Sequence, residues 1–256
     1  MRAFIAFTKK EFLESLRTYR LIILLVVFLL LGVMSPLFAK LLPEILGSVD
    51  MGNGVVLTIP ESGAMDSWTQ FFKNVGQIGM LTLIITFCGI MANEFSRDTL
   101  INLLTKGMKR HTVILSKFLS ASILWLASYL LCLGICYVYT VYYWPVNELH
   151  HVVVAFLAPW LFGELMIALL IFGGIVFKNF YGSLLTCGGV IIILNLIGII
   201  PKSAKFNPVI LSGGTPLSLL DSQIMIGEVI PAMGICVLMI LSLMIASIVV
   251  FNKKQM

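Results

Sequence analysis

Long apolar blocks dominate the sequence, at about residues 21–39, 76–93, 118–142, 152–177, 181–200 and 229–251. A helix of about twenty residues crosses the hydrocarbon core of a bilayer, and backbone groups in lipid must form their hydrogen bonds within the segment. Charged residues make up only 11% of the chain, whereas a soluble domain carries about 25%. The blocks are continuous rather than alternating, which argues against a β-barrel. We therefore predict an all-α polytopic membrane protein with six transmembrane helices.

Lys and Arg residues concentrate on one side of these predicted spans. Thirteen of the seventeen lie in the N-terminal segment, the second loop, the turn at Lys178 and the C-terminal tail 252–256. The other four lie in the predicted outer loops 40–75 and 201–228. Because basic loops stay in the cytoplasm, we expect both termini to be cytoplasmic. Basic residues placed beside apolar spans set topology, so the net charge of +5 does not indicate nucleic-acid binding.

The first twenty residues predict a separate amphipathic helix. Apolar side chains from Phe4 to Tyr19 can share one helical face, while charged side chains occupy another. This pattern is typical of a helix that lies along a membrane surface. We predict such an elbow helix at 1–20, with no cleavable signal peptide. Its candidate functional residues are Lys9, Lys10, Phe12, Arg17 and Arg20.

The predicted cytoplasmic segment 94–117 is the most informative loop. It contains a short amphipathic helix, for which Asp98 or Thr99 is a suitable N-cap and Gly107 a suitable stop. A cytoplasmic helix joined to two spans can transmit motion from a soluble partner, although the segment can also be read as a passive loop. The candidate coupling residues are Glu94, Arg97, Asp98, Thr99, Leu100, Leu103, Leu104, Gly107 and Arg110.

Two polar residues fall deep inside predicted spans. Glu164 is costly to place in a membrane, so such a residue usually faces a bundle interior or a cavity. It either contacts cargo or a proton, or makes a hydrogen bond that packs two helices. Asn195 is a weaker case of the same kind, and it is a possible partner of Glu164.

Several classes of active site are missing from the sequence. There is no GxxxxGK[ST] motif, so we expect no direct binding of ATP through a P-loop. There is no HExxH or GxSxG motif, and the five cysteines lie in apolar runs without CxxC spacing. We read these cysteines as packing residues. We therefore expect no metal site and no catalytic residues, and hence a subunit that is not an enzyme.

Two stretches, residues 9–36 and 93–121, resemble the type-2 ABC transporter permeases. The first is similar to the elbow helix of that family running into its first span. Asp98 stands where glycine is common in the second, and Gly107 stands where proline is common, but both preserve a helix cap and a helix stop. The matching positions in the second stretch are Glu94, Thr99, Leu100, Leu103, Leu104, Gly107, Arg110 and Lys117.

The resemblance implies a partnership and a cargo class. Two permease chains, identical or related, would pair in the plasma membrane of a prokaryote, and separate P-loop ATPase subunits carrying ATP and Mg²⁺ would grip the segment 94–117. The elbow helix would brace this contact against membrane lipid. Cargo would be hydrophobic or amphipathic, such as a drug, an antimicrobial peptide or a lipid. Export is expected, because no feature suggests a dock for an import binding protein.

Other functions remain compatible with the residues. The chain can be a membrane anchor or assembly protein that recruits a soluble factor through the segment 94–117. It can be an intramembrane enzyme that uses Glu164 with His150 and His151, or a permease for ion extrusion. A companion ATPase would favour transport over the anchor and the enzyme.

Overall fold

The computed structural model describes residues 2–48, 62–96, 108–145 and 149–253, and all regular structure in these ranges is helical. Two elements differ from the α-helical form: η1 is a π-helix and η2 a 3₁₀-helix. The elements are α1 (Arg2–Arg17), α2 (Arg20–Ser48), α3 (Ala64–Asn74), η1 (Val75–Gly79), α4 (Met80–Phe87), α5 (Ala92–Ser96), α7 (Arg110–Tyr143), α8 (Val152–Phe177), α9 (Phe180–Gly198), α10 (Pro201–Ala204), η2 (Pro208–Ser212), α11 (Thr215–Leu220) and α12 (Ile226–Lys253).

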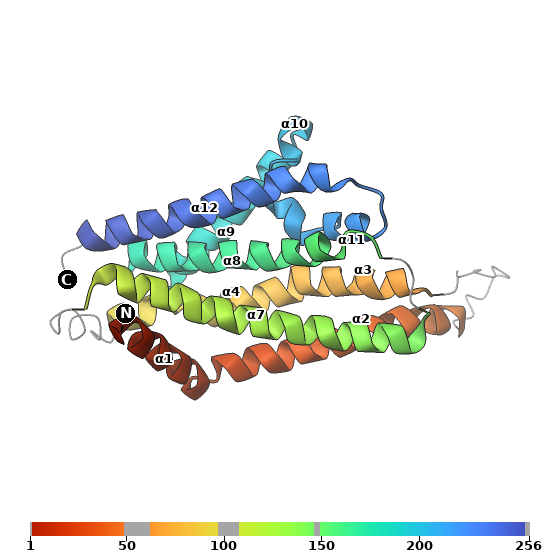
Figure 1. The fold of residues 1–256 in the computed structure, drawn as a ribbon, viewed down its shortest axis with the longest axis horizontal. Coiled ribbons are helices and arrows are strands. Elements are labelled where there is room, and N and C mark those ends of the chain that lie inside the picture. Colours follow the sequence, from red (N-terminus) through yellow and green to blue (C-terminus); the bar gives the residue numbers. More distant parts are fainter. Residues whose placement is uncertain (1, 49–61, 97–107, 146–148, 254–256) are drawn as a thin grey trace.

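The described residues contain six helical stretches that are long and apolar enough to cross a membrane, which confirms the predicted fold class. They run side by side as one bundle (Figure 1). The end at which α1 begins and α12 ends is called the terminal end here, and the other end the opposite end. The location of the terminal end in the cytoplasm stays a prediction.

The predicted loops are shorter than expected, because helices continue into them. Within the expected outer loop 40–75, α2 continues to Ser48 and α3 begins at Ala64. Within the segment 94–117, α7 begins at Arg110. Hydropathy marks only the part of a helix that crosses lipid, so polar ends are missed. In α3 the polar Asp66 and Lys73 masked a helix that buries aromatic side chains.

The expected loop 201–228 is also largely helical. It contains α10, η2 and α11, each of which has a proline in its first two positions. Proline is favoured there because its fixed φ suits a helix and its missing N–H would be unpaired anyway.

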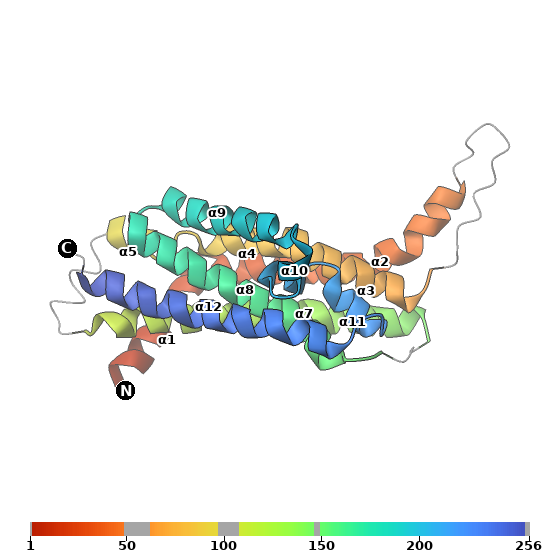
Figure 2. The same ribbon diagram turned by 90° about the horizontal axis from the view of Figure 1, so that it is seen from above.

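The bundle is built around α8. In the apolar 18-residue stretch of this helix, 78% of the residues are buried inside the protein, compared with 22% in the corresponding stretch of α9. Figure 2 shows α9 at the edge of the bundle, with α8 between α9 and α7. Gly163 explains the close approach of α7 to α8, because a Cβ there would collide with the Trp125 ring. Small residues at such crossings are the usual way in which membrane helices pack closely.

A sharp turn separates helix α1 from α2, so α1 runs at an angle to the bundle. Tyr19 has a φ of 59°, a left-handed conformation, and separates α1 from α2. Phe7, Glu11 and Ser15 are buried on one face of α1, which packs mainly against α7. The apolar Ile5 stays exposed. An amphipathic helix is therefore present where the elbow was predicted, and its contact with a membrane surface stays a prediction.

Candidate functional site

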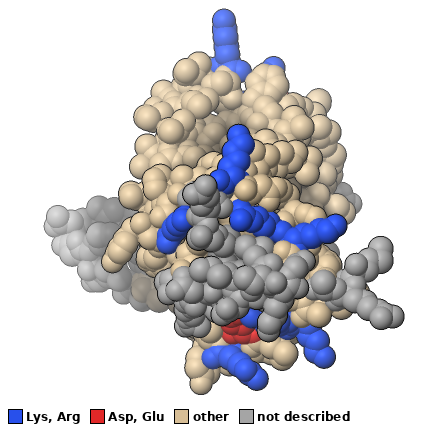
Figure 3. All heavy atoms as spheres, turned by 90° about the vertical axis from the view of Figure 1, so that its left-hand side faces the viewer, with Lys and Arg blue, Asp and Glu red and all other residues tan. Residues whose placement is uncertain are grey.

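The terminal end of the bundle brings together helix ends from distant parts of the sequence. The end of α5, the start of α7 and the end of α12 meet there, beside α1 (Figure 1). Figure 3 shows Lys and Arg side chains spread over this end, with acidic side chains at one place. The residues that link these helices form the candidate site, since they flank both ends of the predicted coupling segment.

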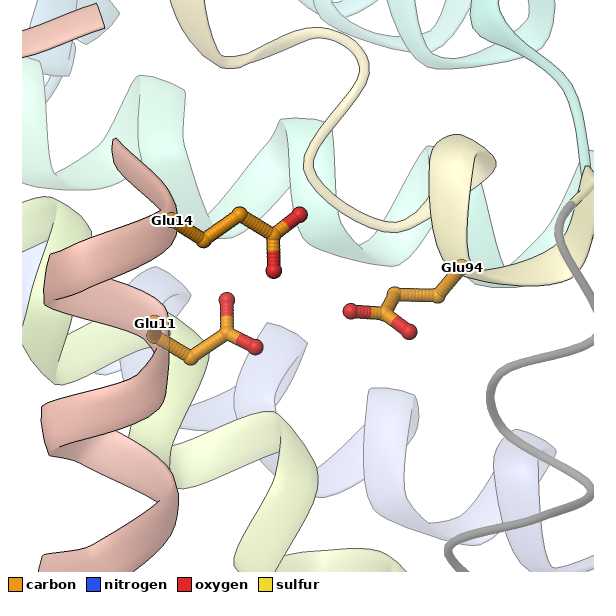
Figure 4. Close-up of side chains that lie close together, drawn as sticks. All are labelled: Glu11, Glu14 and Glu94. Atoms are coloured by element: carbon orange, nitrogen blue, oxygen red, sulfur yellow. The ribbon is translucent and has the colours of Figure 1, made fainter. Parts of the chain in front are cut away.

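Five charged side chains from three helices form what we call the ionic cluster. Helix α1 contributes Lys10, Glu11 and Glu14, α5 contributes Glu94, and α7 contributes Lys117. Figure 4 shows the three carboxylates pointing toward a common space, two from α1 and one from α5. The cluster therefore joins the predicted elbow helix to the start of the predicted coupling segment.

Lys117 lies at the centre of the ionic cluster. Its Nζ donates to Glu11 Oε2 at 2.8 Å and to Glu94 Oε1 at 2.9 Å. Its side chain is 2% exposed, and those of Glu11 and Glu94 are each 4% exposed. Lys10 Nζ closes the cluster from the surface, at 3.0 Å from Glu94 Oε1 and 2.8 Å from Glu14 Oε2.

The electrostatics of the ionic cluster depend on mutual pairing. Burial lowers the pKa of Lys10, but its hydrogen bond to Glu14 and the charges of Glu11 and Glu94 raise that pKa well above the usual lysine value. The contribution of Lys10 to stability is therefore present at neutral pH and is lost only when the pH rises through this raised pKa. Removing one partner of a buried ion pair is strongly destabilising, because the remaining charge is left in a poor solvent.

The carboxylates of Glu11, Glu14 and Glu94 approach one another closely enough to hold a metal ion, since a ligand atom from each lies within 4.8 Å of the others. The ammonium groups of Lys10 and Lys117 already bond to these oxygens. A cation would have to displace both lysines. The donor set therefore fits an internal salt-bridge network better than it fits a metal centre.

A second set of contacts holds the other side of the segment. Arg110, at the start of α7, donates from Nη1 to the backbone carbonyls of Phe251 and Asn252. These carbonyls belong to the last turn of α12, where helix carbonyls lack partners within the helix and where a cation is favourable. The Phe251 ring also packs edge-on against Phe95 of α5 at 6.1 Å between centroids. Lys178 Nζ lies 5.8 Å from the centre of the Phe95 ring.

The predicted coupling residues are thus described only at the two ends of the segment. Glu94 lies in the ionic cluster, and Arg110 caps α12. Between them, the following lie outside the described residues: Arg97, Asp98, Thr99, Leu100, Leu103, Leu104 and Gly107.

The predicted elbow residues do not act as one group. Lys10 belongs to the ionic cluster, whereas Lys9, Phe12 and Arg17 are exposed. Arg20 is half-buried at the start of α2.

The two polar residues inside the spans are not partners, so the suggested pairing of Glu164 with Asn195 is wrong. Glu164 lies buried on α8 and accepts a hydrogen bond from the Ser122 hydroxyl of α7. Asn195 is exposed on α9 and donates to the Ile191 carbonyl of its own helix. The Asn195 side chain bonds to a backbone carbonyl of its own helix, so it needs no partner on a neighbouring span. Glu164 is thus consistent with the helix-packing alternative.

Glu11 and Glu14 of the ionic cluster are not among the candidate residues predicted from the sequence. A signal was present, because Glu11 stands four residues from Phe7 and four from Ser15, on the face that the structure buries. Lys117 was noted only as a position matched in the family, and its pairing with α1 leaves no pattern in the sequence.

Comparison with known proteins gives two matches. A family model described as ABC-2 family transporter protein matches residues 5–256. Over 143 residues, the chain is 27% identical to the Uncharacterized transmembrane protein YxlG of Bacillus subtilis (strain 168). This alignment covers 54% of the chain and 54% of that protein, so the chain spans about half the length of the curated relative it matches. The name of that relative states a membrane location and no activity.

Proposed function

Because the chain belongs to the ABC-2 transporter family, a family of membrane transport components, we propose that it is the permease subunit of an ATP-driven exporter. Separate ATPase subunits would supply the energy, as is normal in this family. Six helices able to cross a membrane support the role of a permease. ATP and Mg²⁺ would bind on the partner and not on this chain.

The observation that carries the proposal is the anchoring of both ends of the predicted coupling segment. At one end, Glu94 is held by Lys117 and Lys10. At the other end, Arg110 is fixed to the last turn of α12. A force applied to the segment would reach α1, α7 and α12 directly, because Glu94 and Arg110 contact these helices through ion pairs or hydrogen bonds. A passive loop would need no such anchors.

Coupling would work as a shift between two conformations. The ATPase subunits would close on ATP and displace the segment between α5 and α7, which would move α1 through the ionic cluster. A partner shifts such an equilibrium only by binding one state better than the other. A second permease chain, identical or related, would complete the path for cargo. The apolar face of α1 would lie in the inner surface of a prokaryotic plasma membrane and brace the movement.

The proposed cargo is hydrophobic or amphipathic. The helices expose a largely apolar surface, on which cargo from the lipid phase could move without crossing water. Glu164, the buried acid of α8, accepts a hydrogen bond from the Ser122 hydroxyl through one carboxylate oxygen, and this single neutral partner does not form a coordination site for a bare ion. This favours amphipathic cargo over ion extrusion.

The proposal is tested by purifying the tagged chain from its native membrane with its bound partners. We expect a P-loop ATPase in the purified complex, with ATP hydrolysis that responds to added amphipathic cargo in proteoliposomes. The variant Glu94→Gln removes one charge from the ionic cluster at the start of the segment, and we expect it to lower the cargo-stimulated part of the activity by about tenfold. The matched control is Glu228→Gln, at the exposed start of α12, which should leave the activity unchanged.

Three results would contradict the proposal. A complete complex without an ATPase would favour a membrane anchor or assembly protein. Equal stimulation in Glu94→Gln and the parent chain would mean that the cluster does not transmit force. Tagging that placed the segment between α5 and α7 on the outer surface would remove it from the reach of any cytoplasmic ATPase.

A further inference from the structure

A cavity of about 350 Å³ lies toward the opposite end of the bundle, where α3 and η1 face the turn between η2 and α11. Figure 1 shows α3 and α11 next to each other in this region. Ligand pockets begin at about this size. The cavity is lined by Thr69, Phe72, Lys73, Gly76, Gln77, Ser212, Gly213, Gly214 and Leu217. From the sequence alone, the stretch 212–215 is predicted to be only a turn.

The backbone builds the walls of this cavity. A Cβ at Gly76 would collide with the Ser212 carbonyl oxygen, so the two walls touch at that point. Gly76 belongs to the π-helix η1, which begins two residues after Lys73. Single π-helical turns inside longer helices are frequent at functional sites. The cavity is therefore a feature of the fold and not a gap between flexible side chains.

The polar side chains that line the cavity differ in their partners. The hydroxyls of Thr69 and Ser212 donate to backbone carbonyls close by in the sequence. The Lys73 ammonium and the Gln77 amide are exposed, and neither makes an ion pair or side-chain hydrogen bond with a described residue. Within the same ranges, the Gly214 backbone N–H also donates to no other group. A lysine, an amide and a backbone N–H around one space favour an anion.

No carboxylate lines this cavity in the part of the chain that the structure describes. The nearest acid on the same helix is Asp66, two turns before Lys73, and its carboxylate accepts from the Gly63 N–H. On the far side, the Asp221 carboxylate accepts from the side chain of Gln223. Among the described residues, Lys73 is thus the one ionisable group of the cavity wall, and its positive charge favours an anionic ligand.

The depth of Lys73 places the cavity near the lipid head groups. The span that contains it runs from Ala64 to Phe95. Lys73 is 22 residues from Phe95 along this span, which includes a turn at 88–91, and about 20 helical residues cross the hydrocarbon core. Phe72 and Leu217 give the cavity an apolar side as well. A ligand there can keep a charged head on Lys73 and an apolar tail in the bilayer.

We propose that this cavity binds the phosphate head group of an anionic amphipathic lipid, with Lys73 as its counter-charge and the Gln77 amide and Gly214 N–H as further donors. The site lies far along the bundle from the ionic cluster and needs no ATPase. It goes beyond the proposed export function, and failure of one would leave the other standing.

The test uses the full chain reconstituted in nanodiscs of phosphatidylcholine with a minor share of phosphatidylglycerol. Native mass spectrometry after release would count the phosphatidylglycerol that stays bound. We expect Lys73→Gln to lower this retention by about tenfold, as for the loss of one charge-assisted hydrogen bond. Lys73→Arg should keep it, because the charge is preserved. Gln77→Leu should lower it by a smaller factor, since a neutral donor is lost.

The matched control is Lys202→Gln, an exposed lysine of α10 that does not line the cavity. It should retain phosphatidylglycerol like the parent chain. The proposal is overturned if Lys73→Gln retains as much lipid as the parent, or if Lys202→Gln loses as much as Lys73→Gln. It is also overturned if inorganic phosphate displaces the bound lipid completely, because the cavity would then be a site for a free anion. Equal unfolding temperatures of all variants would exclude misfolding as the cause.

Discussion

The two ends of the bundle use lysine in opposite ways. At the terminal end, Lys117 is buried and bonds to two carboxylates from two other helices. At the opposite end, Lys73 faces a cavity without an acidic partner among the described residues. The first arrangement uses its charge to hold helices together, and the second leaves its charge available to a ligand. Burial and pairing together therefore separate a structural lysine from a binding lysine better than position in the sequence does.

The largest effect should come from Lys117→Met, which leaves Glu11 and Glu94 buried without their central cation. We expect a loss of about 3–5 kcal/mol in the free energy of unfolding. Thermal unfolding of the purified protein in detergent measures it, with the exposed Lys9→Met on α1 as the control. A loss as small as that of Lys9→Met would mean that Lys117 is not a structural lysine.

Two buried glutamates sharpen the comparison. Glu94→Gln weakens charge-assisted bonds to two lysines, so we expect a loss of about 1.5–3 kcal/mol. Glu164→Gln keeps an oxygen that can accept from Ser122 and removes no ion pair, so we expect a change within about 0.5 kcal/mol. Parallel denaturant titrations would measure both variants. Equal losses would contradict the view that pairing, and not burial alone, gives a charge its structural role.

A smaller effect is expected for Arg110→Gln. The amide can still donate to one carbonyl at the end of α12, but the favourable charge at that helix end is lost, which costs about 1 kcal/mol. Hydrogen exchange should show faster opening of the last turn of α12, with little change at the start of α1. Faster exchange in α1 and not in α12 would show that Arg110 acts elsewhere.

The smallest effect is expected for Lys73→Gln in detergent without added lipid. A lysine that pairs with no described group should contribute less than about 0.5 kcal/mol to the free energy of unfolding. Thermal unfolding of Lys73→Gln and Lys117→Met side by side compares the stability that each lysine contributes. A loss of several kcal/mol would place Lys73 among the structural lysines and would remove the reason to regard it as a binding residue.

The sequence predicted the transmembrane helices well, because crossing lipid requires long apolar runs and nothing else produces them. It failed where helices leave the lipid. Helix α3 carries Asp66 and Lys73, so its hydropathy is that of a loop, although it buries Trp68. The turns of η2 and α11 depend on packing against α8, which no local pattern records.

The candidate site was predicted in outline and not in its contacts. Glu94 and Arg110 were singled out by family resemblance, and the structure places both where the segment joins the bundle. Their partners were hidden for a physical reason. Lys117 bonds to Glu11 across 106 residues, and Arg110 bonds to a backbone carbonyl across 142. A carbonyl has no sequence signature, and a charge pair between distant helices has no periodicity.

The long separation between Glu11 and Lys117 has a consequence for the way the protein is made. Helix α1 leaves the ribosome about a hundred residues before Lys117, so at that stage Glu11 has only the neighbouring Lys10 as a cation and α1 lacks the helix it packs against. Its docking must follow the insertion of α7. The N-terminal helix, although synthesised first, is therefore among the last parts of the bundle to reach its final position.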